Sequence, residues 1–182
     1  IDGASTDGTW EVIRACESPK VVAASEPDQG IYDALNKGLA RATGEVVGFL
    51  HADDVFADAE VLERVGLAFA NPAVDAVYGN LQYVEKDDVS RVIRQWRSAP
   101  FAPGKLASGW MPPHPTLYYV RRSLYDRLGG FDTSYRIAAD YDFILRLFSR
   151  PGLNAVYLPH VLVKMRVGGV SNRSLASIVR KS

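Results

Sequence analysis

The sequence predicts an α/β protein with a mostly parallel central sheet flanked by helices. Up to Trp96, short apolar runs of strand length alternate with amphipathic helical patterns, an order typical of a parallel sheet with crossover helices. The run from Val46 to Leu50 is apolar throughout, as expected of a strand buried on both faces. It leads into two adjacent carboxylates, Asp53 and Asp54, and open α/β sheets bind their ligands beyond the carboxyl ends of the strands.

The first half of the chain contains three helical patterns separated by strand-like runs. A loop rich in turn formers over residues 2–9 leads into the first helix, and Gly44 ends the second. Helices are expected from Trp10, over 31–42 and, from a start near Ala57, through 61–69. Strands are expected at 21–24, 46–50, 74–78, 81–84 and 89–96, the last two as a hairpin or as neighbouring strands.

The pattern changes after Pro100. Residues 101–115 hold four prolines, two glycines and Trp110, so we expect a long ordered loop or a short helix over a site. Regular elements then resume as strands and helices in alternation. They are expected at 116–120 (strand), 123–128 (helix), 137–148 (helix), 156–158 and 161–166 (strands), with a helical pattern from Ser171.

Composition narrows the class of protein. Lys plus Arg and Asp plus Glu number 21 each, so the chain carries no net charge, which argues against a general nucleic-acid binder. The single cysteine, Cys16, cannot form an internal disulfide, which fits a reducing compartment. No apolar stretch approaches the roughly 20 residues that span a bilayer, and no signal peptide precedes the domain. These observations favour a cytoplasmic location.

Two groups of carboxylates, far apart in the sequence, could carry chemistry. Asp53 and Asp54 repel each other, and a hard divalent cation that bridges to a diphosphate would hold both ionised. Asp140 and Asp142 fall near the start of the 137–148 helix. The structural alternatives are that Asp54 and Asp140 cap helices, and that Asp142 pairs with Arg146 four residues on.

Such a division of labour suits transfer at an anomeric carbon with inversion. A cation neutralises the departing diphosphate, and a separate carboxylate takes the proton of the attacking hydroxyl. Other chemistries lack their signatures, because the chain has no zinc-ligand spacing, dinucleotide or phosphate loop, or serine-hydrolase elbow. His114 and His160 could ligate a metal, but a lone histidine beside proline is more often a packing or surface residue.

Four segments, taken in order, resemble one family. They are Ile1 to Thr9 (IDGASTDGT), Asp28 to Gly38 (DQGIYDALNKG), Asp53-Asp54 and Ala138 to Phe143 (AADYDF). They resemble the inverting nucleotide-diphosphosugar glycosyltransferases of family two, which build cell-surface polysaccharides and glycolipids. The resemblance implies a GT-A type fold in a single domain over residues 1–182. Within it, residues 1–98 would form the donor half and 99–182 the acceptor half.

The resemblance also implies roles for individual residues. Asp2 would lie near the nucleotide base, and Arg166 with the Gly168-Gly169 loop would close over the diphosphate. Asp53 would contact the ribose or the metal, and Asp54 would bind Mg²⁺ or Mn²⁺. The donor pocket would be lined by Asp28, Gln29, Gly30 and Lys37. Asp140 matches the catalytic base, and the residues implied near the acceptor are Trp110, His114 and Asp142.

The same resemblance implies the partners. The donor would be a UDP- or GDP-sugar, and the acceptor a saccharide or a lipid-linked molecule at the inner face of the cytoplasmic membrane. The basic end Arg180-Lys181 fits such a peripheral location. Two rival functions remain open: a sugar-phosphate nucleotidyltransferase, and a non-catalytic nucleotide-binding scaffold that keeps the fold.

The chain departs from the family pattern at three places. Asp2-Gly3 stands where many relatives have two acids, and Ala139 where many have a glutamate before the base. The strand-helix-strand unit that relatives carry before Ile1, roughly 30 to 40 residues, is missing. Its absence would expose a sheet edge, and such edges invite pairing with another chain. We therefore expect a homodimer through that edge or local disorder there, and weak or no turnover by this chain.

Overall fold

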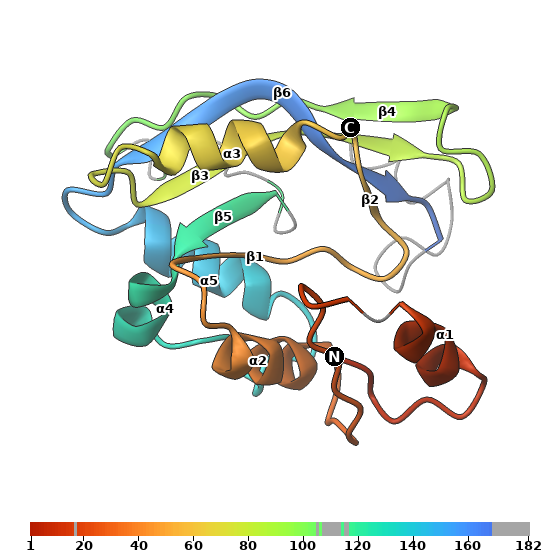
Figure 1. Ribbon diagram of the computed structural model, residues 1–182. Coiled ribbons are helices and arrows are strands. Elements are labelled where there is room, and N and C mark those ends of the chain that lie inside the picture. The colour runs from red at the N-terminus through yellow and green to blue at the C-terminus, as the bar shows by residue number, and fades with distance from the viewer. Residues whose placement is uncertain (17, 105, 107–113, 115–116, 169–182) are drawn as a thin grey trace.

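In the computed structural model, all residues are described except 17, 105, 107–113, 115–116 and 169–182. The described part is an α/β structure in which helices cover both faces of a central sheet (Figure 1). Its helices are α1 (Thr9–Ala15), α2 (Ile31–Arg41), α3 (Val61–Phe69), α4 (Arg122–Leu128) and α5 (Ala139–Phe148). Its strands are β1 (Val46–Gly48), β2 (Val55–Phe56), β3 (Ala76–Val84), β4 (Val92–Trp96), β5 (Tyr118–Arg121) and β6 (Ala155–Arg166).

The sheet confirms the expected α/β class and corrects the expected strand directions. Its order is β1-β5-β3-β6-β2, with β4 paired to β3 as the predicted hairpin. Among the strand pairs of the described residues, β3 and β6 are parallel and the other four pairs are antiparallel. The reason is β5, which lies between β1 and β3 and runs against both. The periodicity therefore predicted correctly that β1 and β3 point the same way, but it could not predict a strand inserted between them.

Two of the strands are longer than the sequence pattern indicates. Gly79-Asn80 does not interrupt β3, and Pro159-His160 does not divide β6. A Cβ atom on Gly79 would lie 2.6 Å from Leu162 Cγ and 2.8 Å from the His160 carbonyl oxygen. The glycine therefore permits close approach of β3 and β6 where their register shifts, between Tyr78 and Asn80.

The two faces of the sheet are covered by different helices (Figure 1). One face packs on α3, whose buried residues Val61, Val65 and Phe69 contact Val77 and Leu81 in the same apolar cluster. The other face packs on α2, α4 and α5, and its cluster is rich in aromatic rings. Tyr125 and Phe143 stack there with ring centroids 4.4 Å apart. Alternating residues of β3 supply both clusters, as expected of a sheet covered on both sides.

Helix α2 is tied to the segment that precedes α5. The Asn36 side chain donates to the Phe131 carbonyl oxygen and accepts from the Phe131 amide, both at 2.8 Å. Gly130 makes room for this contact, because a Cβ there would lie 2.4 Å from Asn36 Oδ1. The contact joins residues 95 positions apart and fixes α2 against the start of α5.

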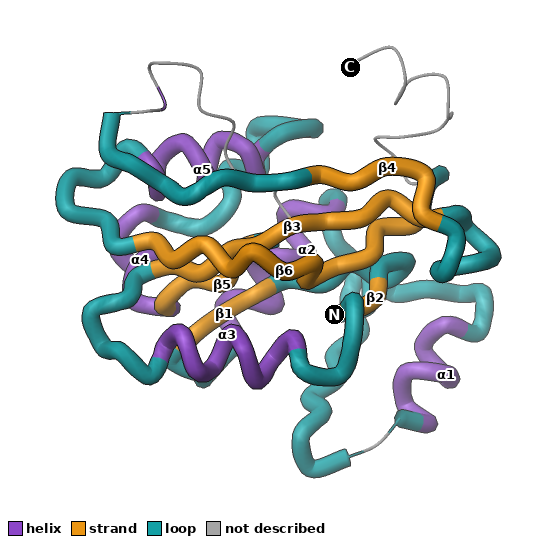
Figure 2. Tube along the Cα trace, turned by 90° about the horizontal axis from the view of Figure 1, so that it is seen from above, coloured by secondary structure: helices purple, strands orange, loops and turns teal. Residues whose placement is uncertain are grey.

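Several smaller expectations differ from the structure. The third helix begins at Val61 rather than near Ala57, because Val55–Phe56 first pairs with β6 as β2. The expected strand at 21–24 is reduced to a parallel bridge between Asp2 and Ser25. Helix α1 lies apart from the sheet and has no buried residue (Figure 2). The helical pattern from Ser171 lies outside the described residues.

Two further observations bear on the edges and on membranes. In the described part of the chain, β1 pairs on one side only, with β5, so it forms one end of the sheet. Over the same residues, every helix is too short or too polar to cross a bilayer.

Candidate active site

The acidic pair lies in the turn between β1 and β2. The Asp54 amide donates to the His51 carbonyl oxygen at 3.0 Å, which closes the turn. The Asp54 side chain is 7% exposed, and its Oδ1 accepts a hydrogen bond from the Arg166 amide at 3.3 Å. The helix-capping alternative for Asp54 is wrong, because α3 begins seven residues later and has no side-chain cap.

Electrostatics at this turn are unfavourable to two negative charges. Burial raises the pKa of Asp54 to about 6, the negative charge of Asp53 adds to that rise, and the nearby Arg166 opposes it. Arg166 Nε is buried and has no hydrogen-bond partner within the described residues. The Asp54 carboxylate, whose negative charge is not fully compensated, thus lies near the Arg166 guanidinium group, whose Nε has no acceptor among the described residues.

These residues fit a divalent cation that is shared with a phosphate-bearing ligand. Mg²⁺ and Mn²⁺ prefer oxygen ligands, and Mg²⁺ is commonly held by one or two carboxylates together with substrate phosphates. Asp53 and Asp54 supply such oxygens. Within the residues that the structure describes, no group of three or more Asp, Glu, His or Cys side chains could hold a metal. The cation would therefore depend on ligands from the substrate, and Arg166 Nε would find its acceptor on the same anion.

Asp140 lies in the first turn of α5. Its Oδ1 accepts hydrogen bonds from the Tyr32 hydroxyl at 3.1 Å and from the Tyr141 amide at 2.8 Å. The N-cap position belongs to Ala138, whose backbone is left-handed with φ 77°, and the helix has no side-chain cap. The helix-capping alternative for Asp140 is therefore wrong as well.

One imidazole lies within electrostatic range of both acidic groups. Burial lowers the pKa of His51, while the charges of Asp53 and Asp140 each act to raise it. The ring of His51 also interacts with His114, whose pKa is lowered to about 4, first by burial and then by the charge of His51. Residues from the turn after β1, the start of α5 and the segment before β5 are thus brought together. This is the convergence that the spacing of the carboxylates along the chain could not show.

The loops at 1–5 and 24–30 form one substructure beside α2. Asp2 is buried and accepts hydrogen bonds from the Ser25 hydroxyl at 2.6 Å and from the amide and hydroxyl of Ser5. The two hydroxyls hold the pKa of Asp2 below its usual value. Asp28 Oδ1 accepts from the Gly30 amide at 2.8 Å. The Asp28 carboxylate also lies against Gly3, where a Cβ would be 2.4 Å from Oδ2.

Lys37 and Gln29 secure this loop to α2. Lys37 Nζ lies 3.0 Å from Asp33 Oδ2 and donates to the Pro27 carbonyl oxygen at 2.6 Å. The Gln29 amide donates to the same Asp33 oxygen at 3.0 Å. Lys37 is therefore already engaged within its own helix and loop, and its expected contact with a donor stays a prediction.

The three residues expected near an acceptor have different surroundings. His114 meets the rings of Trp96 and Tyr83 edge-on, with centroid distances of 5.6 and 6.1 Å. Asp142 forms the predicted pair with Arg146, with Oδ2 and Nε 2.8 Å apart. Arg146 in turn donates to the carbonyl oxygens of residues 128–130, so this pair braces the loop after α4. Trp110 lies outside the described residues.

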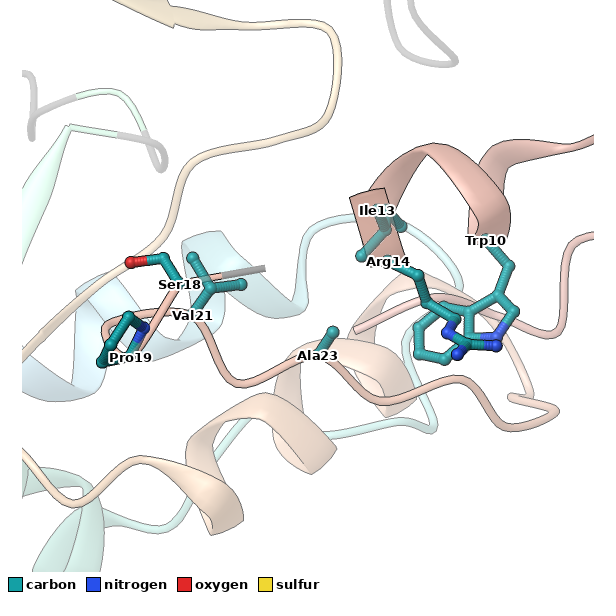
Figure 3. Close-up of a pocket in the computed structure, with 7 residues that line it drawn as sticks. All are labelled: Trp10, Ile13, Arg14, Ser18, Pro19, Val21 and Ala23. Carbon is teal, nitrogen blue, oxygen red and sulfur yellow. The ribbon is translucent and has the colours of Figure 1, made fainter. Parts of the chain in front are cut away.

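Two cavities of the described structure lie elsewhere. One of about 550 Å³ opens between α1 and the segment at 18–23 (Figure 3). It is lined by Trp10, Ile13, Arg14, Ser18, Pro19, Val21 and Ala23. A second, of about 320 Å³, lies between β1 and α3 and is mostly apolar. Neither contains a carboxylate of the candidate site.

Sequence reasoning overlooked two residues of the site. They are His51, which carried no predicted role, and Tyr32, which entered only as part of the resembling segment. The signal for Tyr32 was present, because it lies on the same face of α2 as Leu35, Asn36 and Leu39, which contact the segment and cluster around α5.

An α/β sheet of this topology, with an acidic turn after one strand in which Asp54 is buried, and with a second carboxylate at the start of α5, is typical of a GT-A type glycosyltransferase domain. Residues 1–144 match the model of the family described as glycosyl transferase family 2. The chain belongs to this family, and the match contains every predicted site residue except Arg166.

Curated relatives agree with this assignment. The chain is 34% identical over 179 residues to a "PGL/p-HBAD biosynthesis glycosyltransferase" of Mycobacterium bovis, covering 94% of this chain and 66% of the relative. It is also 34% identical over 152 residues to an uncharacterised glycosyltransferase of Mycobacterium tuberculosis, covering 80% of this chain and 55% of the relative. The chain thus spans just under two thirds, or less, of the length of these relatives.

Solved structures show the same fold. A mannosyltransferase from Pyrobaculum calidifontis, in complex with GDP-Man and Mn²⁺, superposes with a TM-score of 0.64 at 26% identity. That match covers 99% of this chain and 50% of the mannosyltransferase. The S. aureus protein TarS (residues 1–349), in complex with UDP-GlcNAc, superposes with a TM-score of 0.67 at 16% identity, over 91% of this chain and 48% of TarS. The GT-A type fold expected from the sequence is confirmed.

Proposed function

We propose that this chain is the catalytic domain of a metal-dependent glycosyltransferase that transfers a sugar, with inversion, from a nucleotide-diphosphosugar to a hydroxyl group. The observation that carries the proposal is that the charges of Asp53 and Asp140, which are far apart in the sequence, both act on His51. This supports a cation-binding pair and a separate carboxylate acting in one site, as single displacement requires. The 26% identical mannosyltransferase with GDP-Man and Mn²⁺ supports a sugar nucleotide as donor.

The donor occupies the side of the site built by residues 1–98. Asp2 and its serine partners lie near the nucleotide base, and the loop at 28–30 with Lys37 lines the pocket. Asp53 and Asp54 would hold Mg²⁺ or Mn²⁺ on the diphosphate, and the cation when bound neutralises the charge of the leaving group. Arg166 supplies a second positive charge, and its buried Nε finds an acceptor on the diphosphate.

The acceptor approaches from the side built by residues 99–182. Asp140 takes the proton of its hydroxyl group while the oxygen bonds to the anomeric carbon. The bond from that carbon to the diphosphate oxygen breaks, and the electron pair leaves with the diphosphate. General-base catalysis of this kind contributes about 10² to 10⁴ in rate. His114 and Asp142 lie on this side, where they contact the acceptor or brace the loops around it, and Trp110 stays a predicted acceptor residue.

The name of one relative supports a class of acceptor. The curated relative of Mycobacterium bovis is named for PGL/p-HBAD biosynthesis. We therefore infer a saccharide or lipid-linked acceptor, used at the inner face of the cytoplasmic membrane in cell-surface polysaccharide or glycolipid synthesis. The open side of β1 supports a homodimer in which two copies pair edge to edge. Light scattering after size-exclusion chromatography tests that arrangement, and a monomer at micromolar concentration contradicts it.

A donor screen tests the proposed reaction. The protein is incubated with UDP- and GDP-sugars and Mn²⁺. The release of nucleoside diphosphate is measured while the sugar is transferred to water or to an added sugar alcohol. We expect release from at least one donor, about 10² to 10⁴ times slower in Asp140→Asn, with donor binding by calorimetry unchanged. The matched control is Asp87→Asn, which changes an exposed carboxylate in the β3–β4 turn.

The outcomes separate the rival functions. Unchanged turnover in Asp140→Asn contradicts the base assignment. Pyrophosphate release from a nucleoside triphosphate and a sugar phosphate indicates a nucleotidyltransferase instead. Donor binding without turnover by the wild type and by longer forms of the protein indicates a scaffold.

A further inference from the structure

We infer that Tyr32 is a positioning residue for Asp140: its hydroxyl group holds one carboxylate oxygen and leaves the other to take the acceptor's proton. The inference rests on the proposed function, because it assigns the group that prepares the proposed base. It adds a residue from α2, which lies 108 positions before Asp140 in the chain.

The hydrogen-bond directions around the Tyr32 hydroxyl are fixed by chemistry. The Ala138 amide lies 2.9 Å from the hydroxyl oxygen and can only donate to it. An ionised carboxylate can only accept, so the hydroxyl proton is directed to Asp140 Oδ1, 3.1 Å away. The Tyr141 amide donates to the same oxygen at 2.8 Å. Within the described residues, Asp140 Oδ2 accepts no hydrogen bond, so it is the oxygen available to a substrate.

The backbone before Asp140 needs this support. Ala138 adopts φ 77° and ψ 18°, a left-handed conformation that is costly for a residue with a side chain. Its carbonyl oxygen accepts from the Asp142 amide at 2.9 Å, and the neighbouring Ala139 is completely buried. The Tyr32 hydroxyl satisfies the Ala138 amide on the other side. One hydroxyl group thus fixes both the turn that leads into α5 and the carboxylate it presents.

Tyr32 is itself held in place. Its ring packs on Phe131 with centroids 6.0 Å apart. Asn36, one turn further along α2, makes two hydrogen bonds to the Phe131 backbone. Residues four apart share a helix face, so Tyr32 and Asn36 both contact the segment 131–138. The hydroxyl position is therefore set by the fold rather than by a bound ligand.

Several titratable side chains surround the Asp140 carboxylate. The titratable groups that interact with the carboxylate from neighbouring elements are Tyr32 on α2, His51 after β1 and Tyr118 on β5. On its own helix, Asp142 is paired with Arg146. Burial and the charge of Asp140 both raise the pKa of Tyr32, so the hydroxyl keeps the proton that it donates. A donated hydrogen bond favours the ionised carboxylate, the form that acts as a base.

The test measures the carboxylate directly. In protein labelled with ¹³C at the aspartate carboxyl groups, the Asp140 signal is identified by its loss in Asp140→Asn, and its pKa is read from a pH titration. We expect Tyr32→Phe to move that pKa upward, because the ionised carboxylate loses a hydrogen-bond donor. The control Tyr135→Phe, an exposed tyrosine of the same segment, leaves it unchanged.

Turnover gives a second measure. With the donor that the screen identifies, Tyr32→Phe is expected to lower kcat roughly 10-fold with little change in KM, and to shift the acid limb of the pH profile upward. In the Asp140→Asn background the same change has no further effect, because the group that it positions is absent. A purely structural role would lower kcat by lowering the folded fraction and would leave the pH limb in place.

A second variant covers a failure of Tyr32→Phe to fold. Incorporation of 3-fluorotyrosine at position 32 keeps the ring and strengthens the donor, so the Asp140 pKa is expected to move downward. An Asp140 titration that neither variant shifts overturns the inference and leaves the proposed function standing. Unchanged turnover in Asp140→Asn, with the titration shifted as expected, overturns the base assignment alone.

Discussion

The backbone amide of Arg166 lies 3.3 Å from Asp54 Oδ1 and connects the end of β6 to the acidic turn after β1. This single hydrogen bond does not compensate for the loss of water around the carboxylate. The pKa of Asp54 is accordingly raised to about 6 by burial and by the neighbouring Asp53.

The raised pKa predicts a stability cost above neutral pH in the absence of a cation. The folded state binds the Asp54 proton more tightly than the unfolded state does. The contribution of this proton to the stability of the folded state is therefore complete below pH 3.8 and is lost as the pH rises through about 6. Asp54→Asn is therefore expected to stabilise the protein at about pH 8 by roughly 1 to 3 kcal/mol, and not at about pH 4. Urea unfolding at both pH values measures this. Equal stabilisation at the two would contradict the assignment.

Divalent cations are expected to reverse that cost. With Mn²⁺ and UDP or GDP at 100 times the dissociation constant, the folded state gains about 2.7 kcal/mol, seen as a rise in Tm. The gain should disappear with EDTA and in Asp54→Asn, and it should weaken below about pH 6, where Asp54 is protonated. Asp87→Asn serves as the control. A Tm rise of full size in Asp54→Asn would place the cation elsewhere.

Gly79→Ala tests the close approach of β3 and β6. The new methyl group would lie 2.6 Å from Leu162 Cγ and 2.8 Å from the His160 carbonyl oxygen, so the strands must separate locally. We expect a loss of about 1 to 3 kcal/mol in the free energy of unfolding. Gly66→Ala in α3 is the matched control, because no atom lies within 4 Å of its Cβ position. That change should stabilise the helix by about 0.5 to 1 kcal/mol.

Asn36→Ala tests the link between α2 and the start of α5. It removes both hydrogen bonds to Phe131 and leaves two backbone groups without partners, at an expected cost of about 2 kcal/mol or more. Hydrogen exchange should accelerate at residues 131–138 ahead of the rest of α5. Asn36→Asp keeps the acceptor and loses the donor, so its effect should be intermediate. Exchange that changes only within α2 would show that the two elements are not coupled.

The sequence allowed the main helices and the ion pair within α5 to be predicted. Periodic apolar residues placed α2, α3 and α5 to within a few positions, because each buries one stripe against the sheet. The Asp142–Arg146 pair followed from four-residue spacing alone. Local patterns were sufficient for these features, since the interacting residues are neighbours along one element.

Features that depend on distant partners were not accessible in this way. The direction of β5 depends on its insertion between β1 and β3. Gly79 resembled a turn because the residue that it contacts, Leu162, lies 83 positions further along the chain. The burial of Asp54 and the hydrogen bond from Tyr32 to Asp140 also depend on contacts between segments that are remote in the sequence. The resemblance pointed to the carboxylates Asp54 and Asp140, but only the folded structure shows which residues surround them.

The inserted strand β5 has a consequence for how the site works. It hydrogen-bonds to β1, which leads to the acidic turn, and to β3, while the helix that follows it packs with α5, which carries Asp140. The acidic turn is thus attached to the sheet through β1, and Asp140 is carried by a helix that packs on the same sheet. Their positions are set when the chain folds, so in the proposed reaction adaptation to different sugars would fall to the loops that border the sheet.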